Sequence, residues 1–111
     1  MKTNDKFILD NNGEPVACDD LDHWAKWFEK ADRKVAKSYV GTALIYTVFL
    51  GLNHNYGEGD PILWETLIIG GPLDNEMDRC CGSREQAEAM HALMVAKVKA
   101  VLSLCEEQTN K

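Results

Sequence analysis

Three polar residues stand at positions where the surrounding pattern is apolar, and their types are those of a metal site or an acid–base site. Glu65 interrupts the apolar run ILWETLII, His54 follows shortly after the run ALIYTVFL, and His91 falls on the apolar side of the C-terminal helical pattern. A carboxylate and two imidazoles can bind a divalent cation or transfer protons. If their elements converge, the three are candidate catalytic residues and weak candidate metal ligands.

Each of the three also has a structural explanation. Glu65 can face solvent or pair with an Arg or Lys, and each His can be a hydrogen-bonded structural group, because nothing in the sequence forces the three side chains together. We favour this alternative. We therefore expect no bound metal and no cofactor.

The four cysteines form no recognisable site. Cys80 and Cys81 are adjacent and lack the C-x-x-C spacing of zinc or redox motifs, although with His91 and Cys105 they offer the donors of a Cys/His site. We expect Cys18 and the others to be reduced thiols in the cytoplasm. The chain also lacks a phosphate-binding GK[ST] motif and a G-x-S-x-G nucleophile motif.

Length and charge limit the class of protein. The 111 residues fit a single domain, residues 1–111. The net charge of −6 disfavours direct binding to nucleic acids or to anionic membranes. No apolar stretch has the length of a signal peptide or a membrane span, so we expect a soluble cytoplasmic protein.

Hydrophobic periodicity and turn residues predict the elements that must position these side chains. An Asn-Gly turn predicts an N-terminal hairpin at about 6–18, and a helix capped by Asp follows at about 20–32. Apolar strands occupy about 34–70, residues 73–82 are expected to be irregular, and an S-x-x-Q capping box opens a helix at about 84–105. The order is ββαβββα. The prediction is an α+β domain with a mainly antiparallel sheet of four or five strands, packed by two helices.

The loop between the two central strands is the predicted contact with a partner. Its sequence, NHNYGEGD, is polar and contains two glycines, so Tyr56 is the aromatic residue most expected to be exposed. Exposed Tyr residues serve as anchors at protein interfaces. We take Tyr56, Glu58 and Asp60 as candidate partner-binding residues.

Three segments resemble a family of small hypothetical proteins common in bacteriophages and prophages. They are TVFLGLNH at Thr47–His54, PILWETLIIGG at Pro61–Gly71 and AEAMHALMV at Ala87–Val95. The family typically carries STVFLGLDH, LFETMIFGG and AxxGHxxMV, and the match covers roughly residues 7–98. His54, Glu65 and His91 fall on motif positions of that family.

Two departures from the family pattern lie near His91. The family has Arg-Tyr where this chain has Arg79 and Cys80, and it has a small residue where this chain has Met90. The family carries no assigned reaction. The resemblance therefore implies a phage-associated setting in a bacterial host cell without implying a chemistry.

The leading hypothesis is a phage or prophage accessory protein that binds an unidentified protein partner, with inhibition of a host defence system such as CRISPR as one such role. Its motivation is the family resemblance, the small acidic domain and the lack of an interpretable catalytic motif. The alternatives are a small metal-dependent or acid–base enzyme using His54, Glu65 and His91, and a self-associating structural protein.

Overall fold

The computed structural model describes residues 5–109, with side chains described as far as residue 105. The two ends of the predicted domain 1–111 lie outside the described residues. The elements follow one another as β1 (Phe7–Leu9), β2 (Pro15–Ala17), α1 (Leu21–Lys30), β3 (Lys34–Val40), β4 (Ala43–Phe49), β5 (Ile62–Ile69), β6 (Met77–Cys81) and α2 (Arg84–Thr109).

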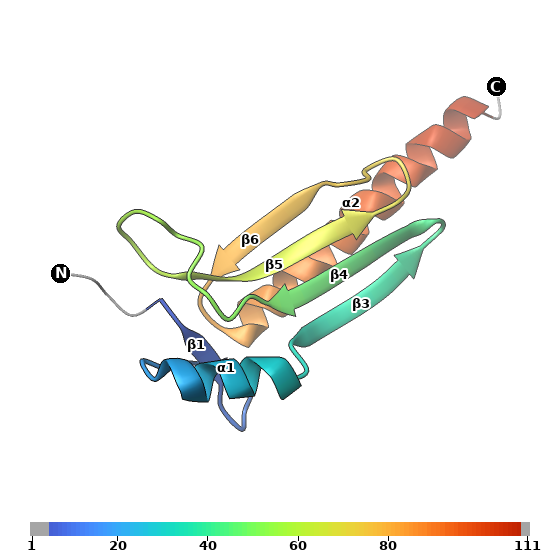
Figure 1. Ribbon diagram of the computed structural model, residues 1–111. Helices are drawn as coiled ribbons and strands as arrows, with labels where there is room; N and C mark the ends of the chain where they lie inside the picture. Colours follow the sequence, from blue (N-terminus) through green and yellow to red (C-terminus); the bar gives the residue numbers. More distant parts are fainter. Residues whose placement is uncertain (1–4, 110–111) are drawn as a thin grey trace.

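The predicted α+β class is confirmed. Strands β3, β4, β5 and β6 form an antiparallel sheet in that spatial order, with β4 and β5 in the middle, and β1 and β2 form a separate hairpin (Figure 1). The order is ββαββββα, so the prediction missed one strand. The segment expected to be irregular contains β6, which pairs with the otherwise unpaired side of β5.

Local signals explain the N-terminal hairpin and the starts of both helices. The carboxylate of Asp10 accepts hydrogen bonds from the backbone N–H groups of Asn12 and Glu14, which closes the turn. Asp20 caps α1 by accepting from the N–H of His23 at 3.1 Å. The predicted capping box at α2 is also present, because Ser83 and Gln86 each accept from the other's N–H.

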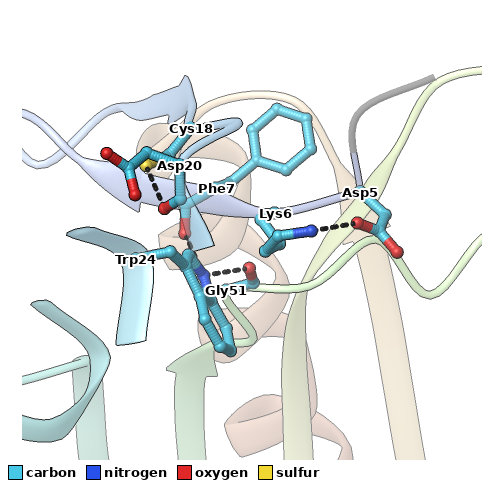
Figure 2. A network of polar contacts seen from close by, with 7 residues as sticks. All are labelled: Asp5, Lys6, Phe7, Cys18, Asp20, Trp24 and Gly51. Carbon is cyan, nitrogen blue, oxygen red and sulfur yellow. Dashed lines mark hydrogen bonds and ion pairs between the residues drawn. The ribbon is translucent and has the colours of Figure 1, made fainter. Parts of the chain in front are cut away.

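Trp24 of α1 fastens the hairpin to the end of the sheet (Figure 2). Its indole N–H lies 3.1 Å from the carbonyl oxygen of Phe7 in β1 and 3.0 Å from that of Gly51, just after β4. The N–H of Phe7 donates to the same Gly51 carbonyl, and the N–H of Asn53 donates to Asp5. Three separate parts of the chain are thereby joined at one point.

Helix α2 covers one face of the sheet and continues beyond it towards the C-terminus (Figure 1). Ala43, Ile45 and Ile68 of the two central strands pack with Met94 and Val98 of the helix. A second core cluster lies at the other end of the sheet, where Phe49, Leu63 and Trp64 pack with Ala87 and Met90 of α2, and Trp27 of α1 packs edge-on against Phe49.

The two edge strands are irregular. In β3 the register shifts between Lys34 and Ala36. In β6 the backbone N–H of Arg79 donates to the side chain of Asp78 at 2.9 Å. Bulges, charges and blocked amides of this kind interrupt the regular pairing edge of a sheet.

Gly51 is a position that the fold requires to be glycine. Its φ of +77° is costly for other residues, and an added Cβ would lie 2.8 Å from the ring of Phe28. We expect Gly51→Ala to lower the free energy of unfolding by about 2 to 3 kcal/mol, measured by urea denaturation.

Gly57→Ala is the matched control, because its φ is not positive and the nearest atom to an added Cβ lies 3.8 Å away. We expect a change within about 0.5 kcal/mol there. Equal effects of the two substitutions would contradict the importance of the Gly51 junction.

Candidate functional site

His91 is buried between α2 and the sheet, where it joins a chain of hydroxyl groups. Its Nε2 lies 2.8 Å from the Ser38 Oγ of β3, and its Nδ1 lies 2.7 Å from the Thr47 Oγ1 of β4. Thr47 Oγ1 in turn lies 2.6 Å from the Thr66 Oγ1 of β5. The imidazole and both threonines are buried, so α2 is linked to three strands through polar groups inside the core.

The hydroxyl groups satisfy either neutral tautomer of the ring, because each can donate or accept. Burial lowers the pKa of His91, so the ring is neutral at pH 7. Both ring nitrogens are already hydrogen-bonded to protein hydroxyls, and neither points into a cleft with a lone pair to offer. The arrangement is that of a structural group rather than of a general base or a metal ligand.

Glu65 lies on the opposite side of the sheet from His91. Its neighbour Thr66 belongs to the His91 network, and successive side chains of a strand point to opposite faces. The carboxylate of Glu65 is 2.8 Å from the Nε of Arg79 in β6. The structure therefore does not bring these two candidates together, and Glu65 has the ion pair that the structural explanation assigns to it.

His54 lies in the loop between β4 and β5, apart from the His91 network. Its Nδ1 contacts the carbonyl oxygen of Leu52 at 2.9 Å. Two asparagines hold this loop: the Asn53 side chain accepts from Ile62 N–H, and the Asn55 amide donates to the carbonyl of Asp60 at 2.9 Å. The three sequence candidates thus occupy three different environments.

The same loop presents Tyr56, which is 89% exposed and whose ring centroid lies 6.2 Å from that of His54. The side chains of Glu58 and Asp60 are also exposed. The expectation of an exposed aromatic residue in this loop is confirmed. Its contact with a partner stays a prediction.

Cys80 and Cys81 line a cleft of about 810 Å³ between the N-terminal hairpin and the start of α2. The pKa of Cys80 is raised, chiefly by burial and further by Cys81 and Asp78, so its thiol is protonated and weakly nucleophilic at pH 7. The cleft also contains Glu14, whose carboxylate already accepts from the Arg84 N–H at the start of α2. No disulfide links the four cysteines, all of which are within the described residues.

Residues 5–105 offer neither a cluster of metal ligands nor a helix that could cross a membrane. No group of three or more His, Cys, Asp or Glu side chains in this part of the chain is arranged to hold a metal ion. Within the described residues, neither helix has the length of uncharged apolar sequence that a membrane crossing requires.

The face of the sheet away from α2 has no helix lying across its middle in the described part of the chain (Figure 1). We call it the open face. Tyr39, Ile69 and Met77 on it are 69%, 47% and 49% exposed. Strand alternation and register assign seven apolar and four charged residues to this face: Tyr39, Leu44, Tyr46, Val48, Leu67, Ile69 and Met77, with Lys34, Lys37, Glu65 and Arg79.

One end of the open face is hollowed. The segment that joins α1 to β3 rises beside the sheet and leaves a hollow of about 470 Å³. The residues that line it include Tyr46, Val48 and Leu67 of the sheet and Asp32, Arg33 and Lys34 at the start of β3. The guanidinium of Arg33 is held in place by the Phe49 carbonyl at 2.9 Å and by the ring of Phe28.

No protein-family model, no curated protein and no solved structure matches this chain. The resemblance to the phage family therefore stays a prediction.

Sequence reasoning missed Ser38 and Thr47 as partners of His91, and Thr66 as the partner of Thr47. A signal was present, because Thr47 and Thr66 are the threonines in the middle of two mainly apolar strands. Buried polar groups are almost always paired, so a histidine on the inner face of the helix predicts hydroxyl partners on the strands that it covers.

The network can be tested by a double-mutant cycle. His91→Leu leaves the Ser38 and Thr47 hydroxyls without their imidazole partner, and we expect it to cost about 1 to 3 kcal/mol of unfolding free energy. Thr47→Val should lower the unfolding free energy less in the His91→Leu variant than in the wild type, and the difference is the coupling energy, about 0.5 to 3 kcal/mol. Additive effects in urea denaturation would contradict the network.

The lowered pKa of His91 gives a pH dependence of known sign. The unfolded chain binds a proton near the ordinary histidine pKa of about 6.5, whereas the folded chain binds it at lower pH, so stability falls as pH drops below that value. The fall levels off below the folded-state pKa. Between neutral and mildly acidic pH, the melting temperature of His91→Gln should fall less than that of the wild type. His23→Gln, which replaces an exposed histidine, is the control, and its melting temperature should fall as much as that of the wild type.

Proposed function

We propose that this protein is a phage or prophage accessory protein that acts by binding another protein, with inhibition of a host defence system as one such role. The observation that carries the proposal is the open face. A sheet with one face packed by a helix and the other face apolar has a surface that a second protein can cover.

The size of the open face supports this use. Four strands about 4.8 Å apart and seven residues of about 3.3 Å each span roughly 450 Å², a flat footprint that includes the charged residues of the face. The largest apolar patch on a monomeric protein is about 300 to 600 Å² and is often functional. The charged residues at its borders resemble the polar rim that surrounds the apolar centre of an interface.

The geometry gives less support to the enzyme alternative. Glu65 and His91 lie on opposite faces of the sheet, and both nitrogens of His91 are bonded to hydroxyls. General acid–base catalysis requires a titrating group within hydrogen-bond reach of a bound substrate. The buried imidazole has no such access.

Affinity purification from the bacterial host tests the proposal. We expect the wild type to recover a stoichiometric protein partner, and we expect Tyr46→Thr combined with Leu67→Thr to lose it, because Thr keeps strand propensity but removes apolar contact area. Leu93→Gln is the matched control, since Leu93 is an exposed leucine on α2. Tyr56→Ser tests whether the loop contributes to the same contact.

Two results together would count against the proposal. One is that no stoichiometric partner is recovered, and the other is that a phage lacking the protein keeps full fitness. Retention of the partner by the Tyr46→Thr and Leu67→Thr variant would move the contact away from the open face.

A further inference from the structure

The charge of the open face is opposite to the charge of the whole protein. The chain has twelve Lys and Arg against eighteen Asp and Glu. The open face has three cations, Lys34, Lys37 and Arg79, and a single carboxylate, Glu65, by strand register. The remaining surface is therefore more acidic than the total of −6 indicates. Asp32 and Arg33, which also line the hollow, add one charge of each sign, so cations still outnumber carboxylates around the apolar patch.

Two of these cations have no acidic partner among the residues that the structure describes. Glu65 already pairs with Arg79, and no carboxylate among the described residues forms an ion pair with Lys34 or Lys37. The Lys37 ammonium instead lies 5.6 Å from the centre of the Tyr39 ring. Both lysines are exposed on the edge strand β3, beside the apolar residues of β4.

A second copy of this chain fits the open face poorly. Two copies joined face to face would bring two positive regions together, and like charges across an interface oppose association.

A nucleic acid fits poorly as well. Two unpaired lysines provide few phosphate contacts, while the rest of the acidic protein repels a phosphate backbone. An acidic protein segment needs only local complementarity, with apolar side chains against Tyr46 and Leu67 and carboxylates beside the lysines.

We infer that the open face binds an acidic amphipathic segment of a partner protein, in which apolar side chains are bordered by Asp or Glu. A helix suits this face, because α2 already packs against the other side of the same sheet, and helix-in-groove recognition uses apolar anchors of this kind. One anchor enters the hollow beside Tyr46 and Leu67, and carboxylates pair with Lys34 and Lys37. The inference rests on the proposed function and names the chemistry of the partner.

Defined peptides test it with the full chain. One synthetic amphipathic helix has a leucine stripe bordered by Glu, and its counterpart has Lys in place of every Glu. We expect the Glu peptide to bind and the Lys peptide to bind at least about tenfold more weakly. Added salt should weaken the binding of the Glu peptide, and Tyr46→Thr with Leu67→Thr should abolish it.

Charge reversal on the protein is the second arm. Lys34→Glu with Lys37→Glu should weaken the binding of the Glu peptide by about tenfold, because two attractive charge contacts become repulsive. Lys99→Glu, at an exposed lysine on α2, is the control and should leave the affinity unchanged. If the double reversal does not fold, the salt dependence and the peptide comparison on the wild type still decide.

The inference is overturned if neither peptide binds, if both bind equally, or if oligothymidylate binds more tightly than the Glu peptide. It is also overturned if light scattering shows a dimer that Tyr46→Thr with Leu67→Thr dissociates. If a host partner is lost with Tyr46→Thr and Leu67→Thr but still binds Lys34→Glu with Lys37→Glu, the proposed function stands. The inference that the partner is acidic is then wrong. Recovery of no partner at all would instead remove the proposed function.

Discussion

The buried imidazole of His91 fixes how α2 lies on the sheet. A hydrophobic helix face alone tolerates small shifts, because apolar contacts have no direction. Hydrogen bonds at 2.7 and 2.8 Å do have direction, and a shift of the helix would leave buried hydroxyls on β3 and β4 without partners. The register of Met94 and Val98 against the central strands depends on this polar contact.

A consequence of this arrangement is the asymmetry of the two faces. The central strands are apolar on both sides, yet α2 is placed on one side and α1 lies at the end of the sheet beside the N-terminal hairpin. An antiparallel sheet can leave one face to solvent, but that face is then usually polar. Here the apolar residues Leu44, Tyr46 and Leu67 lie on that face. This difference from the usual pattern is the reason that we propose a function for the open face.

Local rules predicted much of the fold and little of the candidate site. Asn-Gly, Asp20 and Ser83 determine a turn and two helix starts through contacts within a few residues, so the sequence was sufficient there. Strand β6 was missed because its residues, MDRCC, have no apolar alternation. It is an edge strand that forms because its backbone pairs with β5, and its own composition does not favour a strand.

To predict the site, one must know which face of the sheet α2 covers. Strands that are apolar on both sides do not indicate which face that is. Glu65 and Thr66 are neighbours in sequence, and assigning the helix to one face puts one of them in the core and the other on the surface. The sequence placed His91 on the inner side of its helix correctly. It did not indicate that His91 and Glu65 would be separated by the thickness of the sheet.

The irregular edges limit how copies of this protein can assemble. A sheet grows by adding strands along free backbone amides, and this is the route to fibres and domain-swapped chains. The Arg79 amide is already bonded to the Asp78 carboxylate, and β3 loses its regular register at Lys34. Both free edges of the sheet are therefore interrupted, so the exposed apolar face is not accompanied by a regular edge at which a strand of another copy could pair.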